Sequence, residues 1–197
     1  MKKLVVVFIL LSLFSCKDII KGVVNAGSNA TVEKLETSDF NEVVTDSLFK
    51  LSLPNYMKTL SNLNDDASLQ YANIYKETYT IVIYENKQDF IDSFKEYNEY
   101  DDAISFIDNY SRAQTKFITE SLTNKQVIPY NLTEIGGLDA RQIMMKGSLD
   151  GQDIGYVMGY VEGNEYVYMI MTWTLLEKLN KYEETFKGII GSFKLMN

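Results

Sequence analysis

Two pairs of adjacent acids come closest to a catalytic pattern in this chain of 197 residues. The pairs are Asp65 with Asp66 and Asp101 with Asp102. Two carboxylates, one acting as acid and the other as base or nucleophile, are the machinery of most glycoside hydrolases. Adjacent acids in polar segments are more often solvated or cap a helix. The sequence therefore keeps a carboxylate-dependent hydrolase as an alternative, while we expect no catalytic residues.

The first pair belongs to a segment that shares one feature with calcium loops. Oxygen-bearing side chains stand at alternate positions of Asn62-Leu63-Asn64-Asp65-Asp66. The segment lacks the glycine and the distal glutamate of an EF-hand. An ordinary polar turn is the simpler interpretation. We expect no metal site and no cofactor, and calcium binding at Asn62–Asp66 stays an open alternative.

The composition excludes several further chemistries. The sequence contains no histidine and a single cysteine, Cys16, which removes Ser-His-Asp and Cys-His catalysis and the usual zinc sites. No Gly-rich phosphate loop occurs. The formal net charge is −8 and no basic run of five or more residues is present, so phosphate backbones repel the chain. We expect a protein that is not an enzyme and does not bind nucleic acid.

Residues 1–15 have the organisation of a secretory signal peptide. Lys2 and Lys3 give a positive start, and an apolar run follows from Leu4 to Phe14. This run is too short for a hydrocarbon core of ~30 Å, which needs about 20 residues. Its length is that of the apolar region of a signal peptide.

The end of this run, Leu13-Phe14-Ser15-Cys16, resembles the lipobox of bacterial lipoproteins: a branched apolar residue, a small residue, and then cysteine. The resemblance implies cleavage before Cys16, acylation of Cys16 and anchoring in a membrane, since acyl chains contribute about 0.8 kcal/mol per buried CH₂ group. Lys17 rather than aspartate follows the cysteine, which in enterobacterial sorting favours the outer membrane. The leaflet stays open, and an ordinary secretory signal is the alternative.

The rest of the chain divides by its composition. Residues 17–42 mix small, polar and charged residues without periodicity, which is typical of a tether. We therefore predict a signal peptide at 1–15, a lipidated N-terminus and tether at 16–42, and one α+β domain at 43–197.

Runs of alternating, β-branched and aromatic residues predict about six strands. The first covers 47–54 and stops at Pro54. The next two, 69–75 and 78–84, are close enough to pair as a hairpin. The last three, 138–147, 153–161 and 165–173, are joined by short turns and must form an antiparallel meander.

Helical periodicity occupies two regions. The region 87–122 begins after an N-cap residue, Asn86, and its polar break at 98–102 predicts two helices or one kinked helix. The final helix begins after Thr174, which fits a capping box with Glu177, and its apolar stripe should pack on the meander. The predicted fold class is therefore α+β, an antiparallel sheet flanked by helices.

The last strand of the meander is apolar on both faces. A sheet of this kind is covered on both sides, or it leaves one face open for a partner. Core packing is the simpler interpretation. One face carries Tyr166, Tyr168, Ile170 and Thr172, and the other carries Val167, Met169, Met171 and Trp173.

The order of these parts resembles the Mog1/PsbP-like α/β/α sandwich family, which includes several bacterial lipoproteins. The resemblance covers about residues 45–195 and implies a binding or scaffolding module rather than an enzyme. Known members are an extrinsic photosystem subunit and a regulator of a nuclear GTPase. The matching segments are Phe49-Lys50-Leu51-Ser52-Leu53-Pro54, Ile135-Gly136-Gly137-Leu138-Asp139-Ala140, Gly155-Tyr156-Val157-Met158-Gly159-Tyr160, the run from Tyr166 to Trp173, and Gly191-Ser192-Phe193.

Two hypotheses remain beside the hydrolase. The leading one is a membrane-tethered, non-enzymatic domain that binds a protein or a cell-envelope component. The alternative is a lipoprotein that binds a small ligand, a lipid or a sugar, between the sheet and the helices of 87–122. A dry apolar cavity of more than about 300 Å³ at that place would favour the second hypothesis.

Overall fold

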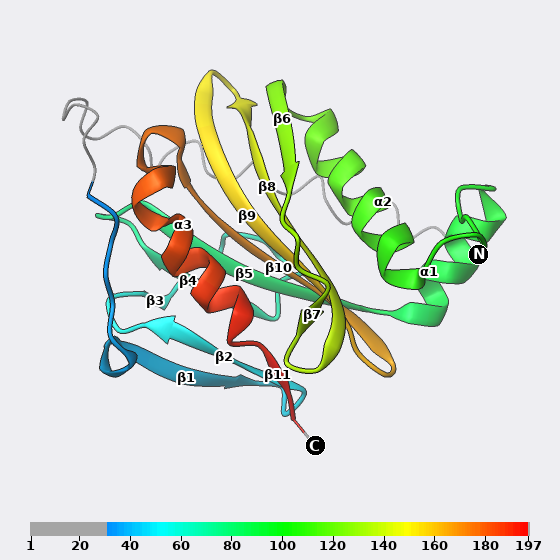
Figure 1. The fold of residues 1–197 in the computed structure, drawn as a ribbon, viewed down its shortest axis with the longest axis horizontal. Helices are drawn as coiled ribbons and strands as arrows, with labels where there is room; N and C mark the ends of the chain where they lie inside the picture. Colours follow the sequence, from blue (N-terminus) through cyan, green and yellow to red (C-terminus); the bar gives the residue numbers. More distant parts are fainter. Residues whose placement is uncertain (1–30, 197) are drawn as a thin grey trace.

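Runs of β-branched and aromatic residues form a large antiparallel sheet in residues 31–196, the part of the chain that the computed structural model describes (Figure 1). The strand order is β3-β4-β5-β10-β9-β8-β6, and β7 pairs with β8. The strands are β3 (Lys58–Thr59), β4 (Leu69–Asn73), β5 (Thr78–Asn86), β6 (Thr123–Pro129), β7 (Glu134–Ile135), β8 (Leu138–Leu149), β9 (Gln152–Glu162) and β10 (Tyr166–Leu175).

The predicted hairpin and meander are both present. Strand β4 pairs with β5, and β8, β9 and β10 follow one another as antiparallel neighbours. The hairpin joins the meander because β5 pairs with β10 at the centre of the sheet. The sheet has more strands than the sequence predicts. Strand β6, for example, lies exposed at the edge, where no alternation of apolar residues is needed.

A second sheet of three strands lies beside the large one, in the order β1-β2-β11. Its strands are β1 (Phe40–Thr45), β2 (Phe49–Pro54) and β11 (Lys194–Leu195), and the short helix η2 (Thr37–Asp39) precedes β1. Strand β2 is the predicted first strand. Strand β1 begins three residues before the predicted start of the domain at residue 43, so the predicted boundary falls inside a strand.

The end of the predicted tether is also built into the fold. The backbone N–H of Glu33 donates to the carbonyl oxygen of Lys181 over 2.8 Å. The side chain of Glu33 is 7% exposed. Its carboxylate forms an ion pair with Lys76 at 2.9 Å and accepts hydrogen bonds from Tyr56 (2.8 Å) and Thr185 (2.9 Å). These partners are distant in sequence, which is why a polar segment read by composition alone resembles a linker. Residues 1–30, including the predicted signal peptide and Cys16, lie outside the described residues.

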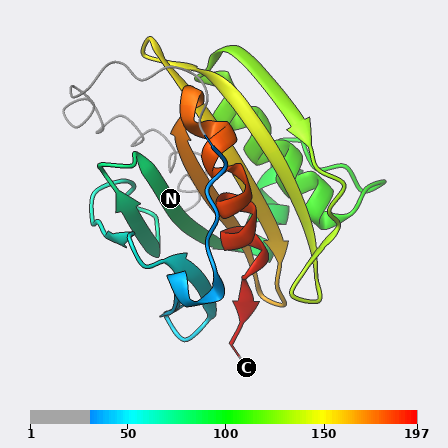
Figure 2. The ribbon, with the colours of Figure 1, turned by 60° about the vertical axis from the view of Figure 1, so that its left-hand side comes forward.

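Helices cover both faces of the large sheet. Helices α1 (Lys87–Glu96) and α2 (Phe106–Glu120) lie on one face, while α3 (Leu176–Gly191) and the small sheet lie on the other (Figure 2). The predicted break thus separates two helices. The cap of α1 is confirmed, because the side chain of Asn86 accepts hydrogen bonds from the backbone N–H groups of Gln88 and Asp89.

The predicted capping box of the last helix is wrong. Strand β10 continues through Thr174 to Leu175, which pairs with Ile154 of β9, and α3 begins directly after it. The side chain of Thr174 is buried, and its hydroxyl has no hydrogen-bond partner among the described residues. Pairing with β9 therefore outweighs the local capping preference, because it holds Thr174 in extended conformation.

The two predicted faces of β10 are confirmed. Tyr168 and Ile170 belong to the core under α3, and Val167, Met169 and Met171 belong to the core under α1 and α2. All five side chains are buried. The sheet is therefore covered on both sides, as core packing requires.

Two glycines of β9 let α3 approach the sheet closely. A Cβ atom on Gly155 would lie 2.6 Å from Cδ2 of Leu179, and one on Gly159 would lie 2.4 Å from Cγ2 of Ile190. Both distances are below any ordinary contact. The helix thus packs against bare backbone at these two points.

This packing predicts opposite effects for two Gly→Ala substitutions. Gly159→Ala should lower the free energy of unfolding by about 1–3 kcal/mol because it overpacks the core. Gly188→Ala, on the exposed side of α3 with no atom within 4 Å of the new Cβ, should raise it by up to about 1 kcal/mol. Urea denaturation of the full chain measures both. Equal effects would contradict the proposed close approach.

Candidate functional site

The other face of the sheet holds a cavity of about 590 Å³ between α1, α2 and the strands beneath them. Ile83 of β5 and Met169 of β10 form its floor. Phe94 of α1 and Phe117 of α2 form walls. The interior surface is therefore mainly apolar. The cavity lies between the sheet and the helices of 87–122, the place named in the small-ligand hypothesis.

Aromatic contacts fill the space next to the cavity. Phe90 stacks on Phe94 with ring centroids 4.2 Å apart and meets Tyr110 edge-on at 5.1 Å. Tyr110 in turn meets Tyr160 of β9 edge-on at 6.0 Å, and the hydroxyl of Tyr160 is 3.1 Å from that of Thr115. This cluster fixes the distance between the helices and the sheet at one end of the cavity.

One charged side chain, Glu85, stands among these apolar groups. It follows Ile81 and Ile83 at alternate positions of β5, so it shares their face of the sheet. Tyr110 and Gln114 of α2 donate hydrogen bonds to the same oxygen, Oε1, at 2.7 and 3.0 Å. Burial raises the pKa of Glu85, and these two hydrogen bonds oppose the rise. Among residues 31–196, no lysine or arginine forms an ion pair with it.

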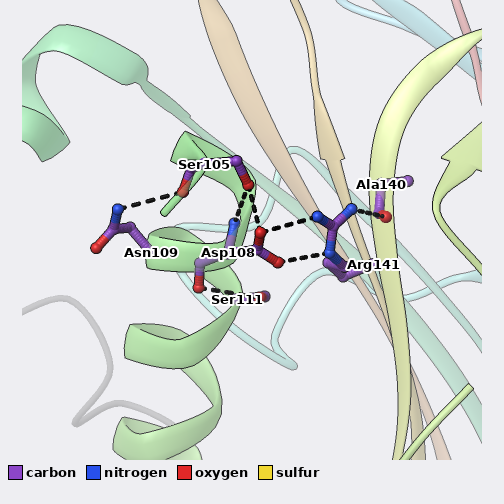
Figure 3. Close-up of polar contacts among 6 residues, drawn as sticks. All are labelled: Ser105, Asp108, Asn109, Ser111, Ala140 and Arg141. Carbon is purple, nitrogen blue, oxygen red and sulfur yellow. Dashed lines mark hydrogen bonds and ion pairs between the residues drawn. The ribbon is translucent and has the colours of Figure 1, made fainter. Parts of the chain in front are cut away.

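Helix α2 is held in place by an ion pair at its first turn (Figure 3). Ser105 caps the helix, and Asp108 binds the guanidinium of Arg141 on β8 through two hydrogen bonds of 2.6 and 2.9 Å. Hydrogen bonding from Arg141 lowers the pKa of Asp108. The pair fixes the turn that precedes Tyr110 and Gln114, and so determines where both donors reach Glu85.

Helix α1 is also fixed at its first turn. Its first residue, Lys87, forms an ion pair with Glu162 at the end of β9. The ammonium group of Lys87 also lies 4.9 Å from the ring centroid of Phe106, the first residue of α2. Together with the Asn86 cap, these contacts hold the beginnings of both helices close to the sheet, and the cavity lies farther along them.

The rim of the cavity is acidic. Asp66, Glu99 and Glu120 line it, against one basic residue, Lys116. The ring of Tyr97 stands at the rim and is largely exposed. The local field therefore favours positively charged molecules over anions.

The predicted pair of Asp65 and Asp66 is only partly at this site. Asp66 lines the cavity, and burial together with the neighbouring Asp65 raises its pKa. Asp65 does not line the cavity, so the structure does not bring the two carboxylates together in it. The two-acid hydrolase gains no support from this pair.

The segment Asn62–Asp66 forms a polar turn. Oδ1 of Asn64 accepts the backbone N–H of Asp66 at 2.8 Å, and Oε1 of Gln70 accepts the backbone N–H of Leu63 at 2.8 Å. One of the oxygens that suggest calcium, Oδ1 of Asn64, thus takes part in the turn itself. Residues 31–196 contain no group of three or more acidic or cysteine side chains placed to hold a metal ion.

The second pair, Asp101 and Asp102, lies away from the cavity. Asp101 accepts the backbone N–H of Ala103 at 3.0 Å, and Asp102 pairs with Lys95 at 2.9 Å. These contacts shape the connection between α1 and α2. Cys16, the predicted lipidation site, lies outside the described residues.

Sequence reasoning did not single out Glu85. A signal was present, because an acid stands at the next alternate position after Ile81 and Ile83, directly after the strand predicted at 78–84. The sequence could not show that α2 lies beside Glu85, because Tyr110 and Gln114 are 25 and 29 residues away along the chain.

The comparisons with known proteins concern the fold. No protein-family model matches the sequence, and a search of curated proteins finds no match. Among solved structures, the chain is similar to cyanobacterial PsbP (CyanoP) from Synechocystis sp. PCC 6803, with a TM-score of 0.55 and 8% identity over 84% of this chain and 97% of that one. It is also similar to the Ran-binding protein Mog1p of Saccharomyces cerevisiae, with a TM-score of 0.52 and 9% identity over 80% of this chain and 96% of that one.

The domain has the PsbP/Mog1 fold. This confirms the fold predicted from the strand and helix order. At such low identity the likeness carries no residue of the cavity from one protein to another. None of the helices in residues 31–196 is both long enough and apolar enough to cross a membrane.

The raised pKa of Glu85 predicts a pH-dependent stability difference. Because the folded protein holds this proton more tightly than the unfolded chain, Glu85 destabilises the fold increasingly as the pH rises from about 4.5 through its folded pKa. Glu85→Gln keeps an acceptor for Tyr110 and Gln114 without the charge. The variant should therefore gain stability over the wild type between pH 4 and pH 7.5.

Urea denaturation at both pH values measures this difference. Glu96→Gln, at the exposed end of α1, is the control that removes an equal charge outside the cavity. A stability difference between Glu85→Gln and the wild type that is the same at both pH values would show that the fold does not raise the pKa of Glu85.

Proposed function

We propose that this protein is a lipoprotein of the bacterial cell envelope whose domain binds a small, mainly apolar molecule without transforming it. The cavity of about 590 Å³ between α1, α2 and the sheet carries this proposal. Its volume lies within the range of roughly 300–1,000 Å³ typical of ligand sites, and a few polar groups converge on an otherwise apolar interior, as such sites require.

Anchoring of the domain is supported by the sequence of the N-terminus. The segment Leu13-Phe14-Ser15-Cys16 follows an apolar run of signal-peptide length, and Cys16 is the only cysteine of the chain. We propose that Cys16 is acylated and that the protein resides at the outer membrane. The residues after Cys16 would then connect the lipid to the domain.

Binding without catalysis is supported by the residue types and by the fold. The sequence has no histidine, and the acid pairs that suggest hydrolysis are not brought together in the cavity. The PsbP/Mog1 fold also fits a non-enzymatic interaction domain.

A protein partner is the second candidate. The observation in its favour is the likeness in fold to Mog1p, which is described as Ran-binding. Under this alternative the domain would bind a protein and the cavity would stay without a ligand.

A neutral fluorescent probe tests the first candidate. N-phenyl-1-naphthylamine should bind the full-length protein in lipid nanodiscs, with empty nanodiscs as the blank. Ala113→Trp on α2 should reduce binding at least tenfold, because the indole fills the cavity that Ala113 lines. Ala103→Trp, at an exposed position before α2, should leave it unchanged. Equal binding by both variants would place the probe elsewhere, and no binding to the wild type would favour the protein partner.

Mass spectrometry of the native protein tests the anchor. The mature chain should begin at Cys16 and carry acyl groups on that residue, and Cys16→Ser should move the protein from the detergent phase to the aqueous phase. Ser15→Ala, which keeps a small residue before the cysteine, is the control and should remain lipidated. A free thiol at Cys16 or a mature end elsewhere would rule out the lipoprotein.

A further inference from the structure

The hydrogen bonds of Glu85 leave one of its oxygens for another partner. Both donors, the hydroxyl of Tyr110 and the amide of Gln114, bond Oε1, and neither reaches Oε2. Both donors are also neutral. They orient the carboxylate toward the cavity without balancing its charge.

An unbalanced carboxylate at this place is costly for the fold. Ile81, Ile83 and Glu85 share the face of β5 that packs under α1 and α2, and an apolar residue at the third position would continue that core. Buried charges in proteins are normally paired or bind a ligand, because burial removes their hydration. Glu85 is partly buried in a ligand-sized cavity and forms no ion pair with a lysine or arginine of residues 31–196, which suggests that its cation belongs to the ligand.

The other charged residues at the cavity also favour a cationic ligand. Asp66, Glu99 and Glu120 outnumber Lys116 at the rim. This field raises the local concentration of cations and repels carboxylates and phosphates. It argues against fatty acids and phospholipids as ligands.

The apolar and aromatic surfaces define the rest of the ligand. Ile83, Met169 and Phe117 offer no hydrogen bonds to a sugar-like body, so this part of the ligand is apolar. The rings of Phe94 and Tyr97 are also suited to a cation, since aromatic faces attract positive charge.

We propose that the cavity binds a cationic amphiphile, an apolar ring or chain that carries a protonated amine or an ammonium group, with the charged group at Oε2 of Glu85. This inference rests on the proposed function, because it names the ligand class of the same cavity. Charge complementarity at Glu85 and at the rim selects this class over neutral and anionic molecules of the same shape.

Three probes of nearly equal shape test the ligand class. They are 1-naphthalenemethylamine, which is cationic at pH 7.5, 1-naphthalenemethanol, which is neutral, and 1-naphthoic acid, which is anionic. Isothermal titration of the full-length protein in nanodiscs should give an affinity for the amine about tenfold or more above that for the alcohol, since both can donate a hydrogen bond to Glu85 but only the ammonium group balances its charge. The acid should bind most weakly.

Two variants locate the effect. Glu85→Gln should reduce the affinity for the amine to that for the alcohol and leave the alcohol unchanged. Glu96→Gln, which does not line the cavity, should change neither affinity. Urea denaturation of each variant verifies that it is folded.

The outcomes separate the two claims. Equal affinities for amine and alcohol, unaffected by Glu85→Gln, would overturn the cationic ligand and leave the apolar binding function standing. Tightest binding of the acid would overturn it as well. Failure of all three probes to bind would remove the proposed function together with this inference.

Discussion

The pairing of β5 with β10 at the centre of the sheet determines both faces of the molecule. Glu85 lies opposite Val167, Ile83 opposite Met169 and Ile81 opposite Met171. Because side chains alternate along each strand, all six residues lie on the face under α1 and α2, where the five apolar side chains are buried and Glu85 is partly buried. A shift of one residue would exchange the two cores completely. Glu85 is therefore held among apolar side chains by the register of the strands.

The two faces differ in how closely helices approach them. Helix α3 packs against the backbone of Gly155 and Gly159, which brings it into close contact with the sheet at these two positions. Helices α1 and α2 are tied to the sheet through their first turns, by Lys87 with Glu162 and by Asp108 with Arg141. The close packing of α3 on its face contributes stability. The other face, where α1 and α2 are tied to the sheet at their first turns, retains a cavity. This division of roles within one sheet is what makes a binding site compatible with a stable core.

Local patterns in the sequence predict those parts of the fold whose signals lie within one element. The three strands of the meander, the hairpin of β4 and β5, and the cap at Asn86 all follow from residues close together in the chain. Features that depend on distant partners do not. Glu33 is bound by Lys76 and Thr185, and Thr174 is held extended by β9, so composition and capping rules both mislead there. Glu85 acquires its role only when α2 brings Tyr110 and Gln114 to it.

Entry of an apolar molecule between the sheet and the helices α1 and α2 would bring it against Ile83 and Met169. Methyl NMR of the full-length protein in nanodiscs, titrated with 1-naphthalenemethanol, tests it directly. The methyl signals of Ile83 and Met169 should shift, while those of Val161 and Ile170, on the face under α3, should not. Shifts confined to Val161 and Ile170, or no shifts at any of the four, would contradict it.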